Sequence, residues 1–158
     1  MIRSVHTIYI DRPVPEVFRY LSDHENRMAW QTNLVSHEGE HLAKGTKVKE
    51  VRNVLGRKIE IEGEITELEE GSRLSFAGSG PHVTRLEYHY RLRPEDHGTR
   101  MDTEVDLELA DHLGLAIPVI QRLTDREVDN AQQTLKDLLE QHQVREIAKT
   151  LPKHAHHK

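Results

Sequence analysis

The chain opens with a segment in which side chains alternate with a period of two. The two sets are Val5, Thr7 and Tyr9 on one side and His6, Ile8 and Ile10 on the other. Such alternation among β-branched and aromatic residues predicts a strand, because successive side chains of a strand point to opposite faces. Asp11 and Pro13 end the pattern.

A helical spacing follows the strand. Apolar side chains recur at i, i+3, i+4 and i+7, at Val14, Val17, Phe18 and Leu21. This is the stripe of a surface helix that lies on a core. We expect the helix to begin between Pro13 and Pro15, because the first backbone N–H groups of a helix have no partner within it.

A second, shorter helix is expected next. Ser22 and Asp23 offer an N-cap for the segment HENRMAWQ, since side-chain oxygens at such a position accept from the first N–H groups. The apolar members of this segment are Met28 and Trp30, the only tryptophan in the chain. The chain therefore begins with a strand, a helix and a short helix.

From residue 34 to residue 109 the pattern changes to strands separated by turns, at Lys44-Gly45, Gly56-Arg57 and Glu70-Gly71. Charged side chains alternate with a mainly apolar set. That set comprises Ile59, Ile61, Ile65, Leu86, Tyr88, Tyr90, Leu92, Met101, Thr103, Val105, Leu107 and Leu109. We expect about six antiparallel strands that form one apolar face and one charged face.

Helical spacing returns after residue 109. Apolar or small residues occupy positions 117, 120, 124, 128, 131, 135, 138 and 139, and Pro152 limits the helix at its end. The order of elements predicts an α+β fold, in which the long C-terminal helix covers the apolar face of a curved antiparallel sheet of about seven strands. A curved sheet and a single helix leave space between them, which is one place where ligand sites form.

Size and charge narrow the interpretation. A chain of 158 residues has room for one domain, and we expect residues 1–142 to form it, with 143–158 as a helix extension and flexible tail. The net charge of −5 is spread through the chain without a basic stripe, which argues against nucleic acid as a partner.

No apolar run approaches the roughly 20 residues that span a bilayer, and no signal peptide is visible. We therefore expect a cytoplasmic protein without membrane insertion.

The residues described above also resemble a known family. The strand, the proline-started helix with Val17-Phe18, the SDHEN turn and Trp30 are followed by strand starts at Gly45-Thr46 and Gly98-Thr99 and by a long last helix. Over residues 3–142 this order is similar to the polyketide cyclase/dehydrase and lipid-transport branch of the START-like, Bet v 1-like superfamily (SRPBCC). The resemblance implies a helix-grip fold, with the sheet wrapped around the last helix and a deep apolar cavity between them.

The same resemblance sets the functional expectation. Members of this superfamily carry lipids, sterols, polyketides, quinones or plant hormones, and some catalyse aromatic cyclisation. The family shares no invariant catalytic residue, so the catalytic residues of this chain stay unknown. If the apolar face is concave, the expected lining comprises Trp30, Ile61, Ile65, Leu74, Phe76, Leu86, Tyr88, Tyr90, Met101, Thr103, Val105, Leu107, Leu123 and Glu127. We expect Trp30 near the entrance. The competing interpretation is that most of these side chains only form core.

A few polar members of this lining carry the chemistry. Tyr88, Tyr90 and Thr103 place hydroxyl groups on an apolar face, where each needs a partner that a ligand or a water can supply. Glu127 lies one turn after Leu123. Turned inward, it would have a raised pKa and suit a general acid or base, whereas turned outward it would be a solvated residue.

One hairpin leaves two registers open. If Val54 pairs with Ile59, then Glu50 and Arg52 share the face of Ile61 and point inward as a charged pair. With a loop one residue longer, Val51, Asn53 and Leu55 point inward instead, because a slip of one residue exchanges the two faces. We favour the second register.

The twelve histidines do not support a metal site, because no pair has the i, i+4 helical spacing with a third ligand nearby. The sequence indicates no cofactor. Three classes of function remain: a carrier or sensor of a small apolar molecule, an aromatase/cyclase-type enzyme with polar cavity residues, and a module that binds a protein partner. A homodimer is left open.

Overall fold

The computed structural model describes residues 1–31, 34–38, 42–54, 56–111 and 114–150, with the backbone alone for 35–38 and 142–150. Its strands form a single antiparallel sheet in the order β1-β7-β6-β5-β4-β3-β2. The strands are β1 Ile2–Ile10, β2 Leu34–Glu38, β3 Lys47–Val54, β4 Arg57–Glu69, β5 Arg73–Gly80, β6 Val83–Glu95 and β7 Gly98–Leu109. The expected seven-stranded antiparallel sheet is confirmed.

The helices also follow the expected order. They are α1 Val14–Ser22, the 3-10 helix η1 His24–Asn26, α2 Arg27–Trp30 and α3 Ile117–Thr150. The Asp23 carboxylate accepts from the Glu25 backbone N–H at 3.0 Å and so caps η1. The helix α3 continues through the first part of the predicted extension, whereas the predicted flexible tail at 151–158 lies outside the described residues.

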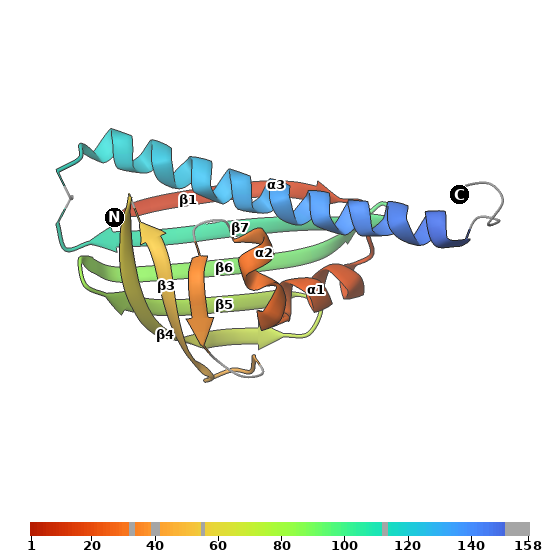
Figure 1. Cartoon of the computed structure of the whole chain (residues 1–158), viewed down its shortest axis with the longest axis horizontal. Helices are drawn as coiled ribbons and strands as arrows, with labels where there is room; N and C mark the ends of the chain where they lie inside the picture. The colour runs from red at the N-terminus through yellow and green to blue at the C-terminus, as the bar shows by residue number, and fades with distance from the viewer. Residues whose placement is uncertain (32–33, 39–41, 55, 112–113, 151–158) are drawn as a thin grey trace.

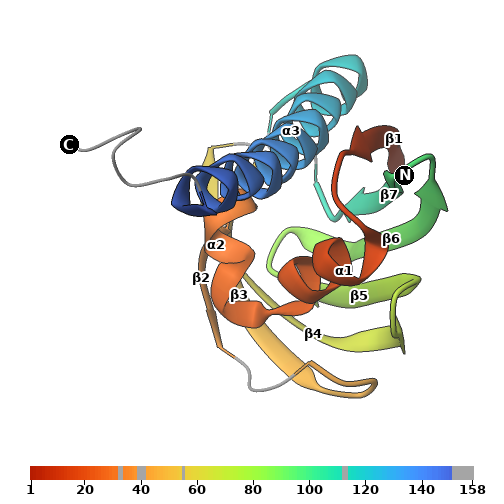
Figure 2. The same ribbon diagram turned by 90° about the vertical axis from the view of Figure 1, so that its right-hand side faces the viewer.

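The sheet curves into an open shell, and α3 runs across its open side (Figures 1 and 2). The helix presents Ile120, Val128, Leu135 and Leu139 to the core, with exposures of 6% or less. Its spacing therefore produces a single buried stripe. The short helix α2 lies against both α3 and β2, inside the curve of the sheet. Among the described residues, no helix has the length and apolar character needed to span a membrane.

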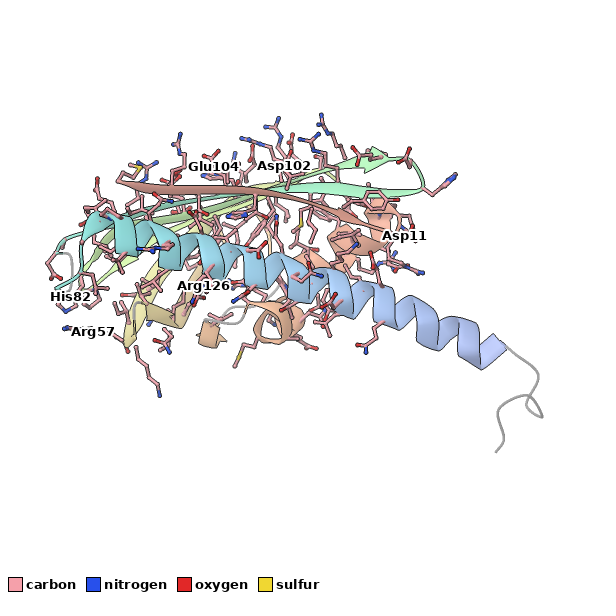
Figure 3. The ribbon with its side chains drawn as sticks, turned by 90° about the horizontal axis from the view of Figure 1, so that it is seen from above. Asp11, Arg57, His82, Asp102, Glu104 and Arg126 are labelled. Carbon is pink, nitrogen blue, oxygen red and sulfur yellow. The ribbon has the colours of Figure 1, made fainter. Side chains whose placement is uncertain are left out.

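The register of β6 and β7 sets the inner face of the sheet. Directly opposed pairs are Leu86 with Leu107, Tyr88 with Val105, Tyr90 with Thr103 and Leu92 with Met101. Apart from the half-buried Tyr88, these residues are 5% exposed or less, whereas Asp102 and Glu104 project from the outer face of β7 (Figure 3). The predicted division into an apolar and a charged face is therefore correct for this hairpin.

The favoured register of the β3–β4 hairpin is wrong. Val54 pairs with Arg57, so that Arg52 lies opposite Ile59 and Glu50 opposite Ile61. Glu50 and Arg52 are accordingly buried, whereas Val51 is half-buried and Asn53 is exposed. Leu55, the third residue expected to point inward, lies outside the described residues. The connection of two residues between the strands, with Gly56 at φ +84°, sets this parity, because glycine adopts the left-handed conformation that tight hairpin turns require.

A close contact between β4 and β5 lets the sheet bend. Gly63 and Gly78 lie opposite each other, and a Cβ atom on Gly63 would meet the Ala77 carbonyl oxygen at 2.2 Å and Gly78 Cα at 2.7 Å. Only glycine fits at this position. The close approach helps to curl the sheet around the space that α3 covers.

Candidate functional site

A cavity of about 390 Å³ lies between the inner face of the sheet and the first half of α3. We call it the main cavity. It is lined by Arg52, Asn53, Val54, Gly56, Leu86, Tyr88, Val105, Leu107, Leu123, Thr124, Glu127 and Val128. Asn53, Gly56 and Glu127 are exposed, which marks the side that opens to solvent. Its volume lies in the range of roughly 300–1,000 Å³ that is typical of small-molecule sites.

Two smaller spaces of about 20 Å³ each adjoin the same side chains. The inner chamber is lined by Trp30, Gln31, Tyr88, Tyr90, Thr103, Glu127, Val128, Ala131 and Gln132. The second chamber is lined by Leu21, Arg27, Gln31, Leu42, Ile65, Leu74, Phe76, Tyr88 and Tyr90. Tyr88 contributes to all three spaces, and Glu127 contributes to the main cavity and the inner chamber. These two residues therefore stand where the spaces meet.

The predicted lining residues divide among these spaces. Leu86, Val105, Leu107 and Leu123 line the main cavity, Ile65, Leu74 and Phe76 the second chamber, and Thr103 the inner chamber. Ile61 and Met101 line none of the three and are fully buried core residues. Trp30, expected near the entrance, is only 1% exposed and lines the inner chamber instead, because α2 turns into the curve of the sheet.

A cluster of charged side chains is buried beside the main cavity. In this buried ion cluster, the two oxygens of Glu50 bind two different cations: Oε1 accepts from Arg27 Nη2, and Oε2 accepts from Arg52 Nε at 2.8 Å. The side chains of Arg27, Glu50 and Arg52 are 8%, 0% and 1% exposed. Buried charges are tolerated when they are paired and hydrogen-bonded in this way.

The Arg52 guanidinium also organises neutral groups. Its Nη2 donates to Gln31 Oε1 at 2.7 Å, and its Nη1 donates to the Tyr88 hydroxyl at 3.2 Å. Arg52 Cζ lies 4.5 Å from the centre of the Tyr88 ring, within the range of a cation–π contact. Tyr88 and Tyr90 stack with their ring centres 6.1 Å apart, and Trp30 meets Tyr90 edge-on at 5.6 Å. An aromatic row thus connects Arg52 to the inner chamber.

The ionisable groups of the site differ in their response to burial. Burial alone would raise the pKa of Glu50, but the charges of Arg52 and Arg27 outweigh it and hold this pKa below its usual value. Glu127 is exposed on its solvent side, but its partial burial against the cavity raises its pKa, and the Arg52 charge only partly offsets this rise. Burial also raises the pKa of Tyr90 strongly, so that its hydroxyl stays protonated. The site therefore holds one carboxylate with a lowered pKa, Glu50, and one carboxyl with a raised pKa, Glu127.

Two further polar groups line the inner chamber. Thr103 Oγ1 accepts a hydrogen bond from Gln132 Nε2 at 2.7 Å, which gives this hydroxyl a partner on an otherwise apolar face. The Trp30 indole Nε1 is buried and has no hydrogen-bond partner among the described residues. A buried donor without an acceptor destabilises the folded state. A ligand acceptor that reached this N–H would remove that penalty and bind more tightly for it.

Sequence reasoning missed Arg27 and Gln31 and favoured the wrong face for Glu50 and Arg52. Arg27 lies on α2 and Gln31 directly follows it, in a segment of which the sequence analysis placed only Trp30, near the entrance. A signal for the hairpin was present, because a glycine at position 56 suits a two-residue turn. That turn would have opposed Val54 to Arg57 and placed both charged residues inside.

The outer face of the sheet carries a separate polar cluster. Ligand atoms of Glu87, His89 and Asp106 lie within 4.8 Å of one another. Each already has a partner: Arg85 binds Glu87, Arg3 Nε donates to Asp106 at 2.7 Å, and His89 lies 3.0 Å from Glu87. The sequence did not reveal this group, because Asp106 comes from β7 and the other two from β6. These pairs form a network on the outer face of the sheet that ties β1, β6 and β7 together.

The chain resembles known proteins in sequence family and in fold. The family described as polyketide cyclase/dehydrase and lipid transport matches residues 1–140. A protein from Thermus thermophilus is 24% identical, with a TM-score of 0.74 over 85% of this chain and 94% of that one. A START superfamily protein from Mycobacterium smegmatis is 14% identical, with a TM-score of 0.75 over 88% and 97% of the two chains.

A third structure, the Aha1 dimer from Colwellia psychrerythraea, is 17% identical, with a TM-score of 0.65 over 89% of this chain and 97% of that one. At these identities the three likenesses establish the helix-grip fold and no shared activity. No curated protein matches the chain.

Proposed function

Because this chain belongs to the polyketide cyclase/dehydrase and lipid transport family, we propose that it binds a small apolar molecule in the main cavity, as a carrier or sensor. The main cavity itself supports this function. Its walls are mostly aliphatic, from Val54, Leu86, Val105, Leu107, Leu123 and Val128. A small number of polar groups, chiefly Arg52, Tyr88 and Glu127, interrupts them at fixed places. This combination of apolar walls and few oriented polar groups is what small-molecule sites share.

Binding of a neutral apolar fluorophore tests the proposal. N-phenylnaphthylamine emits strongly only in an apolar environment, so titration of the protein should give a saturable rise in emission with one site per chain. Leu123→Trp should weaken this binding about tenfold or more, because the indole fills the cavity beside the half-buried Leu123. A rise that does not saturate would contradict the proposal.

Asn130→Trp is the matched control for that variant. Asn130 is exposed on the same helix and lines none of the three spaces. The same indole at this position should leave the dissociation constant within about twofold of the wild-type value. Equal weakening by both tryptophans would mean that the probe binds elsewhere on α3.

An aromatase/cyclase-type enzyme is the second candidate, and one arrangement favours it. Glu127, whose pKa is raised by burial, lines the same cavity as Tyr88 and Arg52. A carboxyl with a raised pKa, in the same cavity as a hydroxyl that can donate to a carbonyl oxygen, is suited to proton transfer at a carbon beside that carbonyl.

Native mass spectrometry of the protein from its own host separates the two candidates. A carrier should retain one unaltered apolar molecule, whereas an enzyme should convert an added polyketone and lose the conversion in Glu127→Gln. Retention of the bound molecule with no conversion of any polyketone would exclude the enzymatic role.

A module that binds a protein partner has less support. A small or filled cavity beside an exposed apolar patch would favour that function, whereas the interior contains the main cavity of about 390 Å³. The exposed large apolar side chains of the described part of the chain are Met1, Val5, Met28 and Ile117. Of these, Val5 lies on β1, Met28 on α2 and Ile117 at the start of α3. Cytoplasmic location and a homodimer stay predictions, and light scattering in solution checks the second.

A further inference from the structure

The buried ion cluster carries an excess of positive charge beside the main cavity. It contains two cations, Arg27 and Arg52, and one anion, Glu50, so its formal charge is one positive unit. The side chains of all three are 8% exposed or less, and solvent therefore screens this excess only weakly. A buried excess charge of this kind favours any negative group that enters the same space.

Among the described residues that line the main cavity, the ionisable side chains are Arg52, Tyr88 and Glu127. Glu127 is the acidic member of this set, and it is exposed at the solvent side. When Glu127 is ionised it balances the excess charge, and when it is protonated the cavity is positive. When Glu127 is protonated, the main cavity can therefore bind a ligand that carries one negative charge.

A specific donor is available for that charge. The Tyr88 hydroxyl accepts a hydrogen bond from Arg52 Nη1 at 3.2 Å, and no described residue accepts the Tyr88 proton. A hydroxyl polarised by a cation donates more strongly, because hydrogen bonds in a chain reinforce one another. An acceptor oxygen in the main cavity would thus meet the Tyr88 O–H with the Arg52 charge behind it.

We propose that the main cavity selects apolar molecules that carry one acidic group, with that group bound to the Tyr88 hydroxyl beside Arg52 and the apolar part against Leu86, Val105 and Leu107. The inference rests on the proposed function and specifies its ligand class. Glu127 acts as the opposing charge. When the anion binds, either Glu127 takes up a proton or the Glu127 side chain is displaced toward solvent.

Two fluorophores that differ in one group test this inference. Anilinonaphthalene sulfonate has the skeleton of N-phenylnaphthylamine with an added sulfonate, which stays ionised at all working pH values. The measured quantity is the ratio of the two dissociation constants. In Tyr88→Phe the dissociation constant of the sulfonate should rise at least about fivefold relative to that of N-phenylnaphthylamine, because the donor to the anion is lost. In Glu127→Gln at about pH 8 the dissociation constant of the sulfonate should fall about tenfold relative to that of N-phenylnaphthylamine, because the repelling charge is removed.

Matched variants control for general effects. Tyr20→Phe removes a hydroxyl from α1 outside the three spaces, and Asp129→Asn removes an exposed acidic group from α3. Both should leave the ratio at its wild-type value. The sulfonate should also bind more weakly in the wild type as the pH rises above 4.5 and Glu127 ionises, and this dependence should be smaller in Glu127→Gln.

The outcomes separate the two proposals. If both fluorophores bind and their ratio is the same in wild type, Tyr88→Phe and Glu127→Gln, the acidic-ligand inference is overturned while the proposed function stands. If neither fluorophore binds at a saturable site, the proposed function fails and the inference fails with it. Neither result depends on a variant of the buried ion cluster, whose removal endangers folding.

Discussion

Glu50 and Arg52, two residues apart on β3, form an ion pair inside the curve of the sheet, with Glu50 Oε2 2.8 Å from Arg52 Nε. Their side chains are 0% and 1% exposed. Residues two apart on a strand share a face, so the register that buries one of them buries both. The pair therefore brings its own counter-charge into the interior, and Arg27 from α2 adds the second cation.

Removal of the central anion should destabilise the protein strongly. Glu50→Ala leaves two buried cations without their carboxylate, and we expect the free energy of unfolding to fall by about 3–5 kcal/mol. Denaturation with urea measures the loss. The exposed carboxylate of Glu64 pairs with Lys47 at 3.2 Å, and Glu64→Ala should cost less than about 1 kcal/mol. Similar losses for the two variants would contradict the role of the cluster.

Acid should weaken the contribution of Glu50. Its pKa is lowered in the folded state from the usual value of 4.5, so the unfolded chain binds the proton first as the pH falls. The stabilisation is complete above the unfolded value and is lost as the pH falls through the folded value. The difference in unfolding free energy between wild type and Glu50→Gln should accordingly narrow below about pH 4.5. A difference that grows in acid would refute this.

Glu127 should show the opposite dependence. Its pKa is raised by burial, so the folded state holds the proton more tightly than the unfolded chain. The ionised form is penalised, and stability falls as the pH rises from 4.5 through the folded value. Glu127→Gln should therefore unfold at a higher urea concentration than wild type at neutral pH and at nearly the same concentration in acid. Carbon NMR of the side-chain carboxyl measures the shifted pKa directly.

The close approach of β4 and β5 at Gly63 and Gly78 leaves no room for a side chain on Gly63. A methyl group on Gly63 would lie 2.2 Å from the Ala77 carbonyl oxygen, which forces β4 and β5 apart. We expect Gly63→Ala to lower the unfolding free energy by about 2–4 kcal/mol. Ser79→Ala, at an exposed position of β5, serves as the comparison and should cost under about 0.5 kcal/mol.

The domain should end near residue 142, as predicted. Leu135 and Leu139 are 0% and 2% exposed, and Glu140 accepts from the Asp11 backbone N–H at 2.9 Å. A chain of residues 1–142 keeps these contacts and should unfold within about 1 kcal/mol of the full chain. A chain that stops at residue 134 loses them and should be several kcal/mol less stable. Urea unfolding of the two chains distinguishes the outcomes.

The strands and helices were predictable because their signals are local. The alternation from Met101 to Leu107 and the helical spacing from Ile120 to Leu139 each report which side of one element is apolar. The side chains on one face of an element are buried together, so a period of two or of about 3.6 is enough to assign the type of the element and its inner face. The long last helix and the two-faced β6–β7 hairpin follow from these periods alone.

The candidate site depended on relationships between elements, which no local period contains. The face of Glu50 and Arg52 was decided by the two-residue connection to β4 and by partners on α2 and β6 that could pair their charges. Trp30 was expected near the entrance, but it lies in the interior because α2 turns inward.

The amino-acid sequence alone therefore determined a curved two-faced sheet covered by one helix, because hydrophobic periodicity is a property of each segment. Only the tertiary structure decided where the main cavity remains open, which charges are buried beside it and how burial shifts the pKa of Glu127. Desolvation and Coulomb interactions depend on distances between residues far apart in the chain, and these distances exist only after the sheet has closed around α3.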